Sequence, residues 1–207
     1  MDETAFLARF QRDPALGPPV AHPGRFAAPT TYAATWEAFG AVLVKVGGVM
    51  LAPTPDWRTA VQSAIDLDQG PVVAASAAQP WLQGVTGWQA AGDTSAPHAW
   101  AGVGLGILVG ELAVAENGAV LLSSRNLPER ALAFLAQRLL VLVPRSALIG
   151  DFISAQARLA EIAHGHHDHH LTWMSGPSKT ADIEQCLVIG AHGARALTVA
   201  VGDGPAP

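Results

Sequence analysis

Cysteine is almost absent from this sequence, and charged side chains are scarce. Cys186 is the single cysteine among 207 residues, so the chain cannot form an intrachain disulfide, a cysteine-bound iron-sulfur cluster or a cysteine-rich zinc site. Charged residues make up 14% of the chain and the formal net charge is -5, which argues against a nucleic-acid-binding protein. We therefore expect no nucleic-acid partner and no cofactor bound by this chain.

Long hydrophobic segments are missing as well. The most apolar run, AGVGLGILVG at residues 101–110, is glycine-rich and much shorter than the roughly 20 residues that a membrane-spanning helix needs. The first residues, MDETAFLARFQRD, are acidic and interrupted by charges, unlike a secretory signal peptide. These features predict a cytoplasmic protein without a membrane span.

The apolar residues that are present suffice for one large buried core, since hydrophobic residues account for 50% of the chain. Residues 1–30 contain a short helical pattern and a proline-rich passage, which predict an N-terminal helix and an extended arm. In residues 31–207 short apolar strands alternate with helices, which predicts a single α/β domain with three αβα layers and a mostly parallel sheet. The expected strands are VMLAP, GPVVAAS, VGLGILVG, AVLLSS, RLLVLVP, LTWMS and ALTVAVG.

Local signals predict the limits and buried faces of individual elements. Thr54 and Pro55 are typical of the cap and first position of a helix, so we expect a helix to begin there. Residues 111–118 are predicted to form a turn or short helix, and residues 146–165 an amphipathic helix. The inward side chains of that helix are expected to be Leu148, Phe152, Ile153 and Leu159.

The stretch MSGPSKTADIEQCLVIGAHG, residues 174–193, concentrates residue types that bind ligands. It follows a predicted strand, and ligands of open α/β sheets bind beyond the carboxyl ends of strands. Gly176 allows the backbone to come close to a ligand, and Ser178, Lys179 and Thr180 bring hydroxyls and a positive charge to an expected helix start. A carboxylate or phosphate is the expected ligand. The alternative is simple helix capping, and the spacing matches neither a Walker loop nor a dinucleotide fingerprint.

We expect two further residues of this stretch, His192 and Cys186, to lie in different surroundings. His192 lies between glycines, which predicts a tight turn near the motif, where the imidazole could bond to the ligand or merely to the backbone. Cys186 has apolar neighbours and is expected to be part of the core.

The passage AVAENGAVLLSS places a carboxylate at the mouth of a turn. Asn117-Gly118 is a strong turn signal, and Glu116 directly precedes it. Glu116 could serve as a nucleophile, a general base or a ligand anchor. The simpler interpretation is a solvated turn residue.

The run HGHHDHH, residues 164–170, is the densest group of potential metal ligands. Imidazoles around Asp168 could bind zinc or nickel. A genuine metal site also needs its ligands held by surrounding hydrogen bonds, whereas this run joins a helix to a strand. We therefore favour a polar loop and predict no metal site.

The stretch SGPSKTADIEQCLVIGAHGARALTV resembles the signature of the LUD-domain family, the group of lactate utilization protein C and YkgG-like proteins. The passage ELAVAENGAVLLSS is similar to the family's Ala-Glu-Thr-Gly-Thr passage, and RALAFLAQRLLVLVP to its arginine-rich helix and following strand. The resemblance covers residues 102–202 well. Asn117 and Ala119 stand where the family usually has threonines, and Ala194 where proline is common, which questions any role that needs the two hydroxyls.

The resemblance implies a fold similar to the NagB/RpiA/CoA-transferase group and a part in oxidising L-lactate to pyruvate. Because this chain cannot hold iron-sulfur clusters, the resemblance places them in partner oxidoreductase subunits, with this chain as a non-redox subunit or accessory protein. Lys179 would pair with a carboxylate ligand, and Glu116 or His192 would handle a proton or hydroxyl. The hypothetical small-anion pocket comprises Glu116, Asn117, Gly118, Gly176, Ser178, Lys179, Thr180, Asp182 and His192.

The sequence leaves open whether the chain is itself catalytic. One alternative is a stand-alone enzyme similar to CoA-transferases or isomerases that uses Glu116 as nucleophile or base. Another is a metal-binding protein centred on the histidine-rich run.

Overall fold

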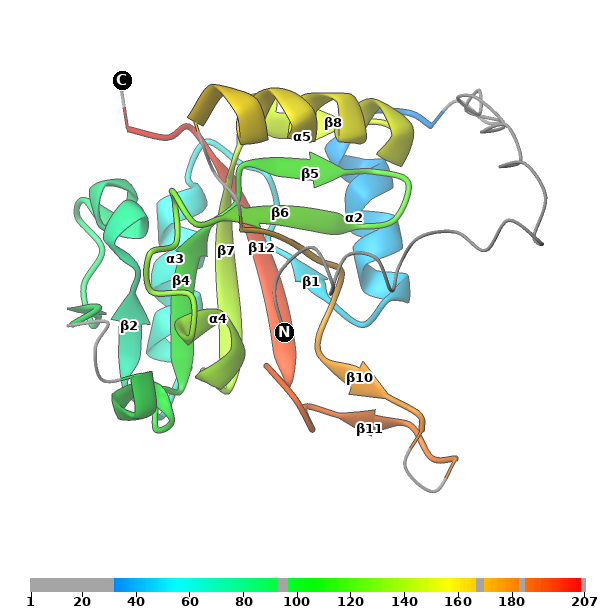
Figure 1. The fold of residues 1–207 in the computed structure, drawn as a ribbon. Helices are drawn as coiled ribbons and strands as arrows, with labels where there is room; N and C mark the ends of the chain where they lie inside the picture. Colours follow the sequence, from blue (N-terminus) through cyan, green and yellow to red (C-terminus); the bar gives the residue numbers. More distant parts are fainter. Residues whose placement is uncertain (1–31, 93–96, 167–169, 183–184, 206–207) are drawn as a thin grey trace, which may run out of the picture.

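The computed structural model describes residues 32–92, 97–166, 170–182 and 185–205 (Figure 1). The N-terminal helix and arm predicted for residues 1–30 lie outside these ranges. The α-helices are α2 (Trp36–Lys45), α3 (Trp57–Asp66), α4 (Leu132–Leu135) and α5 (Phe152–His166). Shorter 3-10 helices are η2 (Ser76–Leu82), η3 (Pro97–Trp100) and η4 (Arg145–Ala147).

A six-stranded sheet forms the centre of the molecule, in the order β1-β12-β7-β4-β2-β3. All of its neighbouring strands run parallel, which confirms the predicted α/β class. The strands are β1 (Val49–Met50), β2 (Val72–Ala74), β3 (Gln89–Ala90), β4 (Leu105–Val109), β7 (Arg138–Pro144) and β12 (Ala196–Gly202). The predicted segments RLLVLVP and ALTVAVG coincide with β7 and β12.

The central strand β7 is apolar on both faces because both faces of the sheet are covered. Leu139, Val141 and Val143 enter the core that includes side chains of α2 and α4. Leu140 and Leu142 point to the opposite side and enter the core that includes side chains of α3 and η2. The alternation of side chains along the strand therefore places one strand in two cores.

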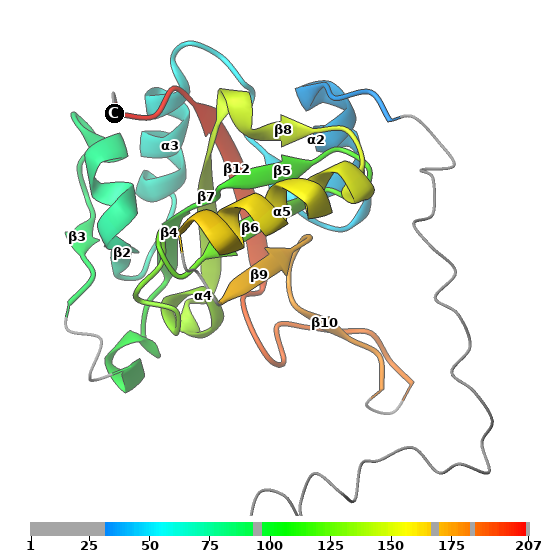
Figure 2. The ribbon, with the colours of Figure 1, turned by 45° about the horizontal axis from the view of Figure 1, so that its top comes forward.

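A second sheet lies between the six-stranded sheet and α5, and it was not predicted as a separate layer (Figure 2). It has the order β8-β5-β6-β9 and consists of β5 (Leu112–Val114), β6 (Ala119–Ser123), β8 (Leu148–Ile149) and β9 (Leu171–Met174). Ala113 and Val120 pack into the core shared with the main sheet. Leu112 and Leu121 point the other way and form a small core with Ile162 of α5.

Two predictions for this region are wrong. Residues 112–114 form strand β5 rather than a turn or short helix, because they pair with β6 and β8. A strand of three buried residues is too short to show a two-residue period in the sequence. The expected helix from residue 146 starts only at Phe152, after η4 and β8, and Ile153 is exposed rather than inward.

The first two described helices, α2 and α3, begin with different residues at the cap position. Thr35 caps α2 by accepting a hydrogen bond from the Ala38 N–H, and the chain leaves this helix through Gly47 at φ +83°. The predicted start of α3 at Thr54 is wrong, since Asp56 occupies the cap position and Pro55 lies in the preceding turn. The Asp56 side chain makes no hydrogen bond to the helix backbone, and its Oδ1 accepts one from the Thr59 hydroxyl at 2.7 Å instead.

An arm extends from the body of the molecule after β9 (Figures 1 and 2). It consists of β10 (Lys179–Thr180) paired antiparallel with β11 (Val188–Ile189). The helix expected to start at GPSKT is therefore absent at residues 179–180, because these residues pair across the arm. Cys186 belongs to the same arm and is exposed, so its predicted core position is wrong.

The longest described helix is α5, with 15 residues. Within the ranges given above, no helix combines the length and apolarity that crossing a bilayer would require.

Candidate functional site

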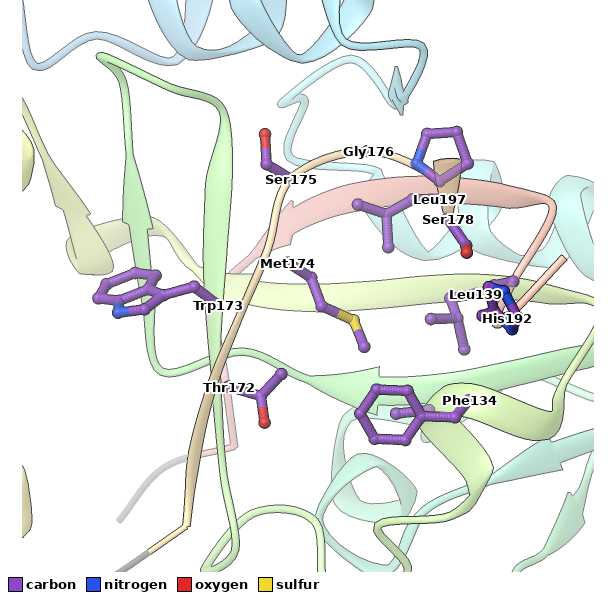
Figure 3. A pocket seen from close by; sticks show the side chains of 14 residues that line it. Phe134, Leu139, Thr172, Trp173, Met174, Ser175, Gly176, Ser178, His192 and Leu197 are labelled. Carbon is purple, nitrogen blue, oxygen red and sulfur yellow. The ribbon is translucent and has the colours of Figure 1, made fainter. Parts of the chain in front are cut away.

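A cleft of about 250 Å³ opens beside the GPS motif, and we call it the motif cleft (Figure 3). Its walls come from α4, β9, the loop at residues 175–178 and the segment that leads into β12. In Figure 3 the Met174 side chain points towards Leu139 and Phe134, whereas Trp173 points away from them. This difference follows from strand alternation in β9, since the Trp173 ring packs instead on Phe152 of α5.

The motif cleft has an apolar floor and a polar margin. Phe134, Leu139, Met174 and Leu197 supply apolar surface, and Phe134 is 45% exposed. Polar lining groups come from Thr172, Ser175, Ser178 and His192. Such a lining suits a small molecule with an apolar part and one polar or charged end.

Gly176 brings the motif loop against the end of α2. Its φ of +72° is unfavourable for residues with a Cβ, and a Cβ there would collide with the carbonyl oxygen of Val46. The group that approaches Gly176 closely is thus a helix end, and the expected approach of its backbone to a ligand stays a prediction.

Lys179 contacts the same helix end. Its Nζ donates a hydrogen bond to the Val46 carbonyl oxygen. An ammonium group is favourable at this position, because the last carbonyls of a helix lack partners within the helix. Lys179 is not part of the cleft lining, but a Cβ built on the lining residue Gly176 would lie 3.3 Å from its Nζ. The positive charge thus lies directly behind the cleft wall.

Ser178 and His192 are brought together by backbone hydrogen bonds at the base of the arm. The Ser178 N–H donates to the Ala194 carbonyl at 2.9 Å, and the Gly190 N–H donates to the Ser178 carbonyl at 2.9 Å. A Cβ on Gly193 would lie 3.2 Å from the Ser178 Cβ, so the two segments are closely packed. His192 and Ser178 consequently face the same cleft although 14 residues separate them in the sequence.

The Glu-Asn-Gly turn lies beside the motif loop. Gly118 has φ +64°, and the Asn117 Oδ1 accepts a hydrogen bond from the Ala119 N–H at 3.0 Å. The Ser175 hydroxyl donates to the Asn117 carbonyl at 2.6 Å, which links the two loops directly. The two motif regions are therefore in contact, although the turn does not line the motif cleft.

The Glu116 carboxylate points to a different part of the molecule. Its Oε2 accepts a hydrogen bond from the backbone N–H of Phe152 at 2.7 Å, at the first residue of α5. A carboxylate stabilises this position because the first N–H groups of a helix have no partners within it. Glu116 therefore has a structural role in this conformation.

The structure places only some of the predicted site residues at the motif cleft. Gly176, Ser178 and His192 line the motif cleft. The remaining predicted residues do not line it: Glu116, Asn117 and Gly118 of the turn, Lys179 and Thr180 of β10, and the exposed Asp182.

Sequence reasoning missed the apolar wall of the cleft. Phe134, Leu139, Met174 and Leu197 were predicted only as parts of helices and strands, and their shared position depends on tertiary packing. The expected location at the carboxyl ends of the parallel strands is wrong, since Leu139 and Leu197 are the second residues of β7 and β12. The motif follows β9, which belongs to the second sheet, so the cleft lies at the amino edge of the main sheet.

The start of α5, which the Glu116 carboxylate contacts, also carries the carboxylate of Asp151. Hydrogen bonds from the Ser154 backbone N–H and then its hydroxyl lower the pKa of Asp151 from its ordinary value of 3.8. Two carboxylates, those of Asp151 and Glu116, thus stabilise the same helix end.

No group of three or more potential metal ligands is found within the described ranges. Residues 164–166 of the histidine-rich run form the end of α5, so the prediction of a loop is wrong for these residues. Their side chains and residues 167–169 lie outside what the structure describes, and the prediction that the run binds no metal stays a prediction.

Comparison with known proteins identifies the wider group. The sequence profile of the LUD domain matches residues 93–201. Lactate utilization protein C of Geobacillus kaustophilus is 36% identical over 91 residues, which cover 43% of this chain and 38% of that protein. Lactate utilization protein C of Bacillus licheniformis is 32% identical over 127 residues, which cover 58% of this chain and 52% of that protein. The matched regions span about two fifths to one half of these relatives.

A solved structure shares the fold. The crystal structure of a DUF162 family protein from Deinococcus radiodurans superposes with a TM-score of 0.57 and covers 81% of this chain and 95% of that chain. Its sequence identity is 17%, so the comparison supports the architecture alone.

Proposed function

Because the chain belongs to the LUD domain family, we propose that it is a lactate utilization protein that lacks a redox centre of its own. In this proposal it serves as a non-redox subunit or accessory protein in the oxidation of L-lactate to pyruvate. The observation that carries the proposal is the LUD domain match over residues 93–201, together with relatives named lactate utilization protein C.

The electrons of lactate oxidation would be accepted by iron-sulfur oxidoreductase partners. Oxidising a hydroxyl to a ketone releases two electrons and two protons, and this chain has only one cysteine with which to ligate a cluster. That cysteine, Cys186, is exposed on the arm. These two facts support the proposed division of labour between this chain and cluster-bearing partners.

The motif cleft is the proposed binding place for the small carboxylate. Lactate and pyruvate each have a methyl group and a carboxylate, which match the apolar floor and the polar margin of the cleft. In this arrangement the methyl group packs near Met174 and Leu197, and the carboxylate is directed towards Ser178 and His192. The Lys179 ammonium group behind Gly176 adds a favourable potential for an anion.

The ligand proposal is tested by thermal unfolding with L-lactate, pyruvate and inorganic phosphate. A ligand that binds only the folded state raises the melting temperature in a concentration-dependent manner. We expect lactate or pyruvate to raise it, and Ser178→Ala and Lys179→Ala to reduce or abolish the rise. Lys45→Ala is the matched control, since Lys45 is the other lysine and is exposed on α2.

Each outcome of this test is informative. A shift of the same size in wild type and Lys179→Ala would exclude the ammonium group from ligand binding. No shift with any of the three anions would contradict the anion pocket, while leaving the family relationship intact.

The role in lactate metabolism is tested in cells. Deleting the gene should abolish or slow growth on L-lactate while growth on pyruvate continues, since only the step before pyruvate would be affected. Equal growth of the deletion strain on both carbon sources would contradict the proposal.

A further inference from the structure

A second hollow lies at the opposite edge of the main sheet from the motif cleft. All six strands are parallel, so their carboxyl ends meet at one edge, where open α/β sheets bind ligands. A hollow of about 460 Å³ is found there, lined by residues within two positions of the ends of three strands: Gly110 and Glu111 after β4, Ser146 after β7, and Gly204 after β12. It is larger than the motif cleft and independent of it.

Polar side chains converge on this hollow from separate segments. Glu111 follows β4, Arg125 and Asn126 follow β6, and Ser146 lies in η4. Trp81 of η2 contributes an apolar wall. Residues so distant in sequence meet here because the strands end side by side.

The Glu111 carboxylate is held in a defined orientation. The Ser123 side chain, on a residue that is only 2% exposed, donates a hydrogen bond from its hydroxyl to Glu111 Oε1. The backbone N–H of Glu111 also donates to the Leu121 carbonyl at 2.8 Å, which anchors the residue to β6. A half-buried carboxylate fixed in this way is suited to accept hydrogen bonds from a ligand hydroxyl.

The edge carries charges of both signs. Arg125 brings a guanidinium group to the same lining as Glu111, and guanidinium groups recognise carboxylates and phosphates through paired N–H donors. At the rim, Arg145 pairs with Asp203 at 3.6 Å, so these two charges largely offset each other. The Asn126 amide supplies further donors and an acceptor within the hollow.

From this arrangement we propose that the hollow at the carboxyl edge binds a small molecule that carries both an anionic group and a neighbouring hydroxyl group. Arg125 and Asn126 bind the anionic group, which is a carboxylate or a phosphate. Glu111 accepts a hydrogen bond from the hydroxyl group. A ligand that has only the anionic group or only the hydroxyl group would bind weakly. The polar side chains that meet the missing group would then have no hydrogen-bond partner.

The test uses isothermal titration calorimetry on the full chain with L-glycerate and glycerol 3-phosphate. Both probes have an anionic group and hydroxyl groups, and the better binder identifies the anionic group as carboxylate or phosphate. Propionate lacks the hydroxyls and glycerol lacks the charge. We expect at least one of the two probes to bind at least ten times more tightly than propionate and glycerol.

Variants then locate the binding. Glu111→Gln keeps an acceptor for the Ser123 hydroxyl, so the fold should be retained while probe affinity falls about tenfold or more. Arg125→Gln should weaken binding similarly, with an unchanged circular dichroism spectrum as the folding check. Ser178→Ala, in the motif cleft, should leave probe binding unchanged.

Three results would overturn the proposal. The first is the absence of binding by both probes at millimolar concentration. The second is equal affinity of wild type and Glu111→Gln for the probes. The third is loss of binding in Ser178→Ala, which would assign the probes to the motif cleft and so separate this proposal from the preceding one.

Discussion

Glu116 Oε2 lies 2.7 Å from the backbone nitrogen of Phe152 and accepts its hydrogen bond. This bond connects a turn between two strands with the first residue of α5. The Glu116 N–H also donates to the Gly150 carbonyl at 2.9 Å, so the residue is held to the start of the helix at two points. The conspicuous carboxylate of the Glu-Asn-Gly passage is thus a helix cap contributed by a distant loop.

Replacing Glu116 should cost stability. Glu116→Ala leaves the Phe152 N–H without its partner, and we expect a loss of about 1 kcal/mol in the free energy of unfolding. Urea denaturation followed by circular dichroism measures this loss. Glu37→Ala is the matched control, since Glu37 is an exposed carboxylate for which the described residues offer no hydrogen bond. Equal stability of the two variants would contradict the capping role.

The Asp151 cap predicts a dependence of stability on acid. Hydrogen bonds from Ser154 lower the pKa of Asp151 below its ordinary value of 3.8, so the unfolded chain binds this proton more readily than the folded chain. The contribution of Asp151 is therefore complete above the unfolded pKa and disappears as pH falls through the lower folded pKa.

The comparison of wild type with Asp151→Asn between pH 7 and pH 3 measures this contribution. Asparagine keeps an oxygen for the Ser154 N–H but does not titrate in this range. We expect the stability advantage of the wild type to be constant at neutral pH and to shrink below about pH 4. An advantage that grows towards acidic pH would contradict the assignment.

Gly176 should tolerate no side chain. Gly176→Ala forces a Cβ into a left-handed conformation and against the Val46 carbonyl, so we expect a loss of about 1 to 3 kcal/mol and a displaced motif loop. Thermal unfolding measures the effect. Gly102→Ala is the control, because a Cβ at Gly102 would have open space around it and no positive φ is recorded there. Comparable melting temperatures would show that the loop adapts freely.

The hydrogen bond from Ser175 to Asn117 should couple the motif loop to the Glu-Asn-Gly turn. Ser175→Ala removes the donor, and we expect faster amide hydrogen exchange at Gly118 and Ala119 with little change in overall stability, since the group is exposed. Amides of β4, in the middle of the main sheet, serve as an internal reference. Unchanged exchange at the turn would show that the loops are held together by other contacts.

Prediction from sequence was most successful where a short segment by itself determines its environment. RLLVLVP is apolar at almost every position, and only a parallel strand covered on both sides buries all of these side chains. The predicted turn at Asn117-Gly118 also holds, because turn conformation is largely a local property of the backbone.

Prediction failed where the partner of a segment decides its structure. Leu112–Val114 became a strand because β6 and β8 offer unpaired backbone groups on both sides, and its own three residues contain no sign of this. Cys186 has apolar neighbours in sequence yet is exposed, because the arm that carries it pairs with itself and extends away from the core.

The sequence by itself determined the family, the α/β class and the parallel strands, since each follows from local pattern or motif. Tertiary structure alone decided which edge of the sheet bears the motif cleft, that the Glu116 carboxylate caps α5, and that Glu111 and Arg125 share a second hollow. These outcomes depend on where distant segments meet. The sequence determines which chemical group each residue carries. Where that side chain points, and which groups it contacts, is decided only when the strands and helices have packed.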